Sequence, residues 1–181
     1  MHTLKLLISP FFLLLSQFGF ARNEDVARKY RNQTEARFLQ TVANVRLLDW
    51  NEGMVAYERS NNPAIKKYAE MMLEDQGVIL MDLNKLALSK NIALPIYLGH
   101  EEEKSLNGLK IRRGLQFDQK FLDKMISDHQ RDLRLFRRAI NFDDIDIRTF
   151  AGKYLSLIQV HLLLAKSLRY QKNAALFTLA R

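Results

Sequence analysis

The sequence predicts an all-α protein folded as an antiparallel four-helix bundle. Apolar residues recur at helical spacing in four long segments, and no segment has the alternation of a strand. With Gly 7 and Pro 3 in 181 residues, turn residues are too few for many short strands. Hydrophobic residues make up 48%, enough for a buried core. Cys is 0, which excludes disulfides, thiolate metal sites and a cysteine nucleophile.

Residues 1–21 predict a secretory signal peptide. The start is positive, residues 6–15 are largely apolar, and Gly19 and Ala21 are the small residues of a cleavage site. The apolar run is shorter than the ~20 residues of a membrane span, and an uncleaved anchor is the alternative. We therefore expect a protein exported to the periplasm or cell envelope. Residues 22–181 would then form a single bundle domain without a transmembrane span.

A strong break separates the first two helices. The first is expected over about 23–60, and Asn61-Asn62-Pro63 ends it. Asn62 is a good N-cap for the second helix, and Pro63 suits its first position. The second helix is expected to run to about Asn91. The stripes of the two helices are Phe38, Val42, Val45, Val55 and Ala56, then Ile65, Tyr68, Met72, Ile79, Leu83 and Leu86.

The second half of the chain holds two more long helices. Residues 92–116 form a longer connection, with a short extra helix expected near 101–112. The third helix starts near Phe117, and a turn at 141–144 leads into the fourth. Their stripes are Phe117, Phe121, Met125, Leu133, Phe136 and Ile140, then Ile147, Phe150, Tyr154, Ile158, Leu162, Ala165 and Leu168. Because each stripe is stable only when it is buried, the four helices should pack as an antiparallel bundle.

Five polar residues lie on these apolar stripes, each near the middle of its helix. Asp49 and Glu52 lie on the first helix, Gln76 on the second, His129 on the third and His161 on the fourth. In an antiparallel bundle, positions in the middle of the helices meet at a similar depth. We therefore expect the five residues to converge inside the bundle, where a charge or an imidazole is costly unless it is paired.

Two arrangements would satisfy these buried groups. One is a hydrogen-bonded network, in which Asp49 or Glu52 accepts from a histidine and Gln76 bridges. The other is a metal site, in which the five residues bind a single iron, zinc or manganese ion. Di-iron carboxylate bundles carry Glu-x-x-His, whereas the residues three before Gln76, His129 and His161 are all aliphatic. The spacing therefore favours the network.

Two segments of the chain resemble each other at an offset of 53 residues. Residues 67–76 align with residues 120–129, so that Asp75-Gln76 matches Asp128-His129. Helical periodicity by itself explains the apolar matches. Only the shared Lys and Asp are evidence that the two segments are related. The similarity suggests that the second and third helices have related roles.

Several short motifs resemble one known family. They are Phe38-Leu39-Gln40, Asn62-Pro63-Ala64-Ile65-Lys66-Lys67-Tyr68-Ala69, Met72 with Asp75-Gln76, Leu94-Pro95, Phe117-Asp118 with Phe121-Leu122, Met125 with Asp128-His129, Phe150-Ala151, and His161-Leu162. Over residues 38–168 the chain resembles the exported bacterial family catalogued as domain of unknown function 4142, whose members are often labelled outer membrane proteins. The resemblance implies a ferritin-like four-helix bundle, and no activity is established for the family.

The resemblance also bears on the candidate ligands. Members of that family usually carry His at the position of Gln76 and Glu near the position of Asp49, often with a second Glu at the position of Asn51. His129 and His161 match the other histidines of the family. If those histidines are metal ligands, the resemblance implies that this chain has lost one of them and has altered the carboxylates.

Charge is distributed unevenly along the chain. Residues 22–103 hold 11 basic and 13 acidic residues, whereas residues 104–181 hold 16 basic and 7 acidic residues. Arg131, Arg134 and Arg138 share one face of the third helix. This face is either a solvated surface or a contact with an anionic envelope surface such as lipid head groups. Export argues against nucleic acid as a partner.

Two functions remain open. The first, which we favour, is a non-enzymatic binding or structural protein of the cell envelope that contacts an anionic surface or another envelope protein. The second is a ferritin-like metal-binding protein or oxidase with a degenerate site inside the bundle. The chain contains neither a phosphate-binding glycine loop nor the spacing of a catalytic triad, so the sequence favours a protein that is not an enzyme.

Overall fold

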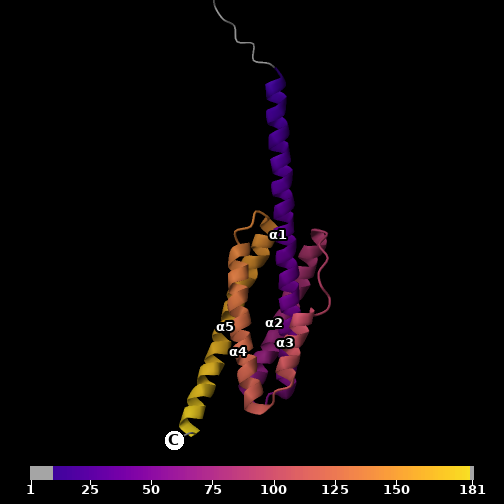
Figure 1. The fold of residues 1–181 in the computed structure, drawn as a ribbon. Helices are drawn as coiled ribbons and strands as arrows, with labels where there is room; N and C mark the ends of the chain where they lie inside the picture. The colour runs from indigo at the N-terminus through magenta and orange to yellow at the C-terminus, as the bar shows by residue number, and fades with distance from the viewer. Residues whose placement is uncertain (1–9, 180–181) are drawn as a thin grey trace, which may run out of the picture. The chain divides into compact units, whose positions relative to one another are not determined.

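The structure is a computed structural model that describes residues 10–179, with side chains at Val26 and from residue 28 to residue 171. Within this range it contains five helices and no strand (Figure 1). The helices are α1 (Pro10–Arg59), α2 (Pro63–Ser89), α3 (His100–Lys110), α4 (Gly114–Ala139) and α5 (Ile145–Leu179). The predicted all-α class is thus confirmed, and α3 is the expected short helix in the connection between the second and the third long helices.

The chain divides into two compact units, residues 1–37 and residues 38–181, and α1 contributes residues to both. The second unit contains the bundle. Residues 1–9 of the expected signal peptide lie outside the described residues, so its cleavage stays a prediction. Over the part of the chain that was searched, no helix combines the length and the apolar character needed to cross a membrane.

The ends of the helices follow local capping rules. Asn62 precedes α2, and its side-chain oxygen accepts the backbone N–H of Ala64 at 2.9 Å and of Ile65 at 3.4 Å, with Pro63 in the first turn as expected. Asp144 caps α5 in the same way, accepting from the backbone N–H groups of Asp146 and Ile147 at 3.0 Å. The third long helix begins at Gly114, three residues before the expected Phe117, and Gly114 has a φ of +53° that glycine adopts without strain.

Helix packing in the second unit places α4 against α5, α2 against α5, and α3 against α4 (Figure 1). The buried apolar residues form two clusters. The first consists of Phe38, Leu39, Val42, Ala43, Ile79, Leu83, Ala87, Leu133, Phe136, Ala139, Ile147, Phe150, Ala151, Tyr154, Ile158 and Leu162. The second consists of Leu48, Val55, Ala56, Ile65, Tyr68, Ala69, Met72, Leu106, Leu109, Phe117, Phe121, Leu122, Met125 and Ala165. All four long helices contribute to both clusters.

Buried polar side chains lie where one apolar cluster gives way to the other along each long helix. We call them the polar layer. Its members are Arg46, Asp49 and Glu52 on α1, Gln76 on α2, Asp128, His129 and Asp132 on α4, and His161 on α5. Since buried polar groups are costly unless they are satisfied, this layer is the part of the core that requires a chemical explanation.

Candidate metal centre

All five polar residues singled out from the sequence are fully buried. Asp49, Glu52, Gln76, His129 and His161 each have 0% of their surface exposed. They belong to four different helices and lie in the same layer, which places them in the interior as the stripe argument expects. Their contacts, however, divide them into two groups, a set of carboxylates and a pair of imidazoles.

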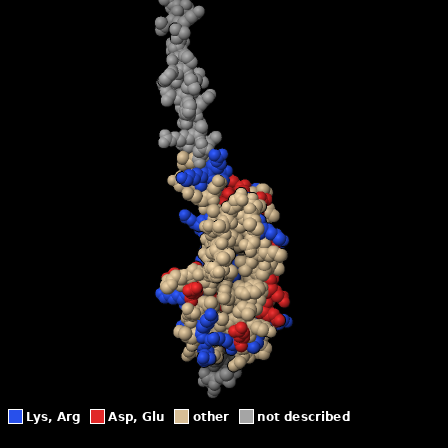
Figure 2. Space-filling view, turned by 90° about the vertical axis from the view of Figure 1, so that its right-hand side faces the viewer, with Lys and Arg blue, Asp and Glu red and all other residues tan. Residues whose placement is uncertain are grey.

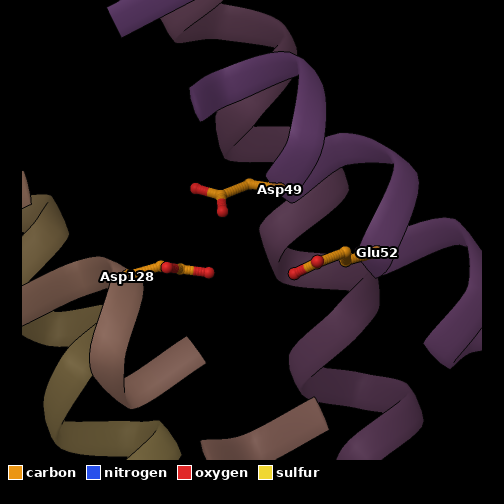
Figure 3. Close-up of side chains that lie close together, drawn as sticks. All are labelled: Asp49, Glu52 and Asp128. Carbon is orange, nitrogen blue, oxygen red and sulfur yellow. The ribbon is translucent and has the colours of Figure 1, made fainter. Parts of the chain in front are cut away.

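The carboxylates form a triad. Asp49 and Glu52 from α1 and Asp128 from α4 offer oxygen atoms that all lie within 4.8 Å of one another. Figure 3 shows the three side chains pointing toward a common space from the two helices. Among the described side chains, neither His129 nor His161 joins a carboxylate in such a three-ligand group. Asp128 was not among the candidate site residues from the sequence. Its alignment with Asp75 in the internal similarity was the feature that could have identified it.

Two cations, the buried Arg46 and the partly buried Lys124, already face this triad. Lys124 Nζ lies 2.9 Å from Glu52 Oε1 and 3.8 Å from Asp128 Oδ2, and it also donates to Ser105 Oγ. Arg46 lies one turn before Asp49 on α1 and is 3.1 Å from its carboxylate. The triad is therefore part of an ion-paired network. Its cations are Arg46 and Lys124, whereas the network expected from the sequence placed a histidine beside Asp49 or Glu52 and had Gln76 as a bridge.

Arg46 also links α1 to α4. Its guanidinium donates to Asp132, which is itself buried on α4. Neither Arg46 nor Asp132 was singled out from the sequence. The signal for both was their spacing, because Arg46 lies three residues before Asp49 and Asp132 three residues after His129, so that each pair shares a helix face.

Burial dominates the titration of the two α1 carboxyls. It raises the pKa of Asp49 to about 6, against the opposing attraction of Arg46. It raises the pKa of Glu52 to about 8, against the opposing attraction and hydrogen bond of Lys124. Desolvation disfavours the charged form of a carboxyl, and here the nearby cations offset that effect only in part. Glu52 therefore holds a proton at neutral pH for much of the time.

The two histidines form a pair on facing helices. The ring centroids of His129 and His161 are 5.4 Å apart, with an angle of 63° between the ring planes. His129 Nδ1 donates to the backbone oxygen of Met125 at 2.9 Å, and His161 Nε2 donates to Asp75 Oδ2 at 2.8 Å. A carbonyl oxygen and a carboxylate oxygen only accept, so these contacts fix which nitrogen of each ring carries the proton.

The opposite nitrogen of each ring is a bare acceptor. His129 Nε2 and His161 Nδ1 are buried and have no hydrogen-bond partner among the described residues, and the same holds for both amide atoms of Gln76. Burial lowers the pKa of His129 well below its ordinary value, and Arg46 and His161 lower it further. Burial also lowers the pKa of His161, although Asp75 opposes the shift. Both imidazoles are therefore neutral at pH 7, the form that binds metals.

The three arginines expected on a basic face of α4 differ in their surroundings. Arg131 pairs with the buried Asp128 at 3.1 Å, so its guanidinium borders the polar layer. Arg134 and Arg138 are exposed on the same helix, and so is Arg131. Figure 2 shows one face of the molecule, on which Lys and Arg lie among Asp and Glu.

A cleft of about 360 Å³ between α3 and α4 borders the charged network. Its lining residues are Glu101, Lys104, Ser105, Gly108, Arg112, Lys120 and Lys124. Lys124 connects this cleft with the interior, because the same ammonium group contacts Ser105 in the cleft and Glu52 in the polar layer. Four of the seven lining residues are basic, which makes the cleft a poor entrance for a cation.

The fold and the site define a class of protein: an all-helical bundle whose core is interrupted by a layer of carboxylates and imidazoles. The chain belongs to the family described as Domain of unknown function (DUF4142), which matches residues 21–168. A crystal structure of a DUF305 fragment from Deinococcus radiodurans is similar in fold, with a TM-score of 0.69 and 14% sequence identity over 76% of this chain and 96% of that chain. A comparison with curated proteins finds no match.

Proposed function

We propose that this protein is an exported helical bundle that binds a metal ion in its polar layer. The observation that carries the proposal is a set of buried donor atoms, His129 Nε2, His161 Nδ1 and the side-chain oxygen of Gln76, that lack a hydrogen-bond partner among the described residues. An unsatisfied buried polar atom costs free energy, and most such atoms in proteins are bonded to protein, water or an ion. Imidazole nitrogens and oxygen donors are ligands of first-row metals.

The predicted export of the protein also supports a metal site made of imidazole and oxygen donors. Residues 1–21 have the three parts of a signal peptide, and the chain contains no cysteine. A metal site built from imidazole and oxygen donors has no thiol to be oxidised in an exported protein. The periplasm or cell envelope is therefore the compartment in which we place the metal-bound protein.

Elemental analysis of the purified protein tests the proposal. The protein would be exported to a periplasm and purified without chelator and without an affinity histidine tag. We expect close to one equivalent of a first-row metal, either as isolated or after incubation with metal and removal of the excess. A folded protein that contains no metal and binds none would contradict the proposal.

Contact with an anionic surface is a second candidate function. Its support is the exposure of Arg134 and Arg138 on α4, together with the excess of basic residues in the second half of the chain. We expect the protein to bind vesicles that contain anionic lipid, and to lose that binding at high salt and in an Arg134→Glu, Arg138→Glu variant. A Lys67→Glu, Lys85→Glu variant, which changes the charge equally on α2, is the control. Binding that is equal at low and high salt would contradict this function.

A further inference from the structure

Two groups of donors in the polar layer compete as ligands for the proposed metal ion. One is the carboxylate triad of Asp49, Glu52 and Asp128, and the other is the imidazole pair of His129 and His161. Hard cations such as Mg²⁺ and Ca²⁺ prefer carboxylate oxygens, whereas imidazole suits borderline ions such as Zn²⁺ and Co²⁺. The ligand set therefore decides which class of metal the protein binds.

The triad already has positively charged neighbours in the protein. Lys124 lies 2.9 Å from Glu52, and Arg46 lies 3.1 Å from Asp49 and donates to Asp132. A divalent cation at the triad would lie beside these two positive charges, and like charges repel strongly in a poorly solvated interior. An arginine stays protonated in a protein, so Arg46 cannot relieve the repulsion by losing a proton. The charge of Arg46 also disfavours positive charge at His129 and His161, so Arg46 does not distinguish the two groups of donors. Lys124 does distinguish them, because its ammonium group pairs with Glu52 and Asp128 of the triad. The triad is thus the poorer site for an added cation.

The imidazole pair has the opposite arrangement. Each ring donates its protonated nitrogen to an oxygen acceptor, Met125 O for His129 and Asp75 Oδ2 for His161. In protein metal sites, a ligating histidine nearly always donates its other N–H to a carboxylate, a backbone carbonyl or water, which orients the ring and raises the basicity of the ligating nitrogen. Both contacts are made here. The two remaining nitrogens are buried without a hydrogen-bond partner among the described residues, as are the carboxylate oxygens of Asp49 and Glu52, so the oriented rings are what distinguish the pair.

The spacing of the rings also fits one shared ion. With metal–nitrogen bonds of about 2.0–2.1 Å and a tetrahedral angle, two imidazole centroids on one ion lie roughly 5 Å apart. The observed centroid distance is 5.4 Å. Gln76 adjoins Asp75 on α2, and its buried amide oxygen is the third candidate donor in the layer.

We infer that His129 Nε2 and His161 Nδ1, with Gln76 as a third candidate donor, form a site for a borderline ion of the Zn²⁺ or Co²⁺ type, and that Lys124 and Arg46 hold the carboxylate triad as an internal ion-pair network. The inference rests on the proposed function and specifies its ligands. It divides the five residues that the sequence grouped together into ligands and structural carboxylates.

Metal titration of matched variants tests the inference. Zn²⁺ and Mg²⁺ affinities would be measured by competition with a chromophoric chelator, on the untagged exported protein. We expect one equivalent of Zn²⁺, no competing Mg²⁺ at millimolar concentration, and at least 100-fold weaker Zn²⁺ binding in His129→Gln and in His161→Gln. His100→Gln, which changes an exposed histidine at the start of α3, should change the affinity less than about threefold, and Asp49→Asn should weaken it less than either histidine substitution does.

A measurement on the unaltered protein avoids dependence on the folding of the variants. In ¹⁵N-histidine NMR spectra, Zn²⁺ should shift the unprotonated nitrogens of His129 and His161 and leave His100 unchanged. Zn²⁺ binding that survives both histidine substitutions but is lost with Asp49→Asn or Asp128→Asn would overturn the inference and leave the proposed function standing. A protein that binds neither ion would overturn the proposed function itself.

Discussion

Asp75 is the residue that orients His161. Its carboxylate accepts from His161 Nε2 at 2.8 Å, and 29% of the Asp75 side chain remains exposed. Asp75 lies one position before Gln76, beside the apolar stripe of α2 and not on it, so the stripe argument passed over it. It acts on the proposed metal through the ring of His161, as a positioning residue.

Replacing Asp75 by Ala should weaken Zn²⁺ binding by about 10–100-fold, because the ring of His161 loses the acceptor that fixes its tautomer. Asp75→Asn keeps an acceptor oxygen, so its Zn²⁺ affinity should fall less than that of Asp75→Ala. Glu74→Ala, a change at an exposed neighbour on α2, is the control. Chelator competition measures all three, and equal affinities for Asp75→Ala and the unaltered protein would show that Asp75 does not position the ring.

Glu52 makes the stability of the protein depend on pH. Burial raises its pKa from 4.5 to about 8, so between these values the folded chain holds a proton that the unfolded chain releases. Stability therefore falls as pH rises through this window. The two histidines have lowered pKa values, and they make stability rise with pH. Their effect is confined to pH values below about 6.5, the ordinary pKa of histidine.

Glu52→Gln should remove this dependence, because Gln does not titrate. Between pH 6.5 and pH 8, the variant should gain roughly 1.6 kcal/mol of unfolding free energy relative to the unaltered protein, because the full slope of about 1.4 kcal/mol per pH unit falls to half at the pKa. Urea unfolding at the two pH values measures the gain. Glu58→Gln, at an exposed position of the same helix, is the control, and parallel pH profiles for all three proteins would contradict the assignment.

At the scale of the helices, the boundary between α1 and α2 depends on one side chain. Asn62 satisfies two backbone N–H groups that begin α2 and have no partner within the helix. Asn62→Ala should lower the unfolding free energy by about 1 kcal/mol, whereas Asn61→Ala, at the exposed neighbouring position, should leave it nearly unchanged. Chemical denaturation of both variants checks the difference, and an equal effect of the two substitutions would contradict the cap.

The sequence predicts the helices better than it predicts the contacts between them. Apolar spacing and the Asn62-Pro63 break locate α2, because these signals are local to one segment. The partners in the polar layer depend on how each helix is rotated against the others, and one sequence does not contain that information. Lys124 shows the difficulty, since its long side chain carries the ammonium group away from the helix axis to reach Glu52 on α1.

At the scale of the whole molecule, metal binding and folding should be coupled. The proposed ligands come from three helices, α2, α4 and α5, so the site exists only in the folded chain. At a free Zn²⁺ concentration 100 times the dissociation constant, the ion should stabilise the protein by about 2.7 kcal/mol. Thermal unfolding with and without Zn²⁺ measures this gain. An equal gain in a His129→Gln, His161→Gln double variant would show that the ion binds elsewhere.

The position of the polar layer between two apolar clusters also restricts how the helices can slide. Moving α1 along its neighbours by one turn, about 5.4 Å, would carry Arg46 away from Asp132 and Glu52 away from Lys124, and would bring both into contact with apolar side chains. A purely apolar core would resist such a slip much less, because one aliphatic contact replaces another at little cost. The same ion pairs that make the layer expensive therefore set the register of the bundle.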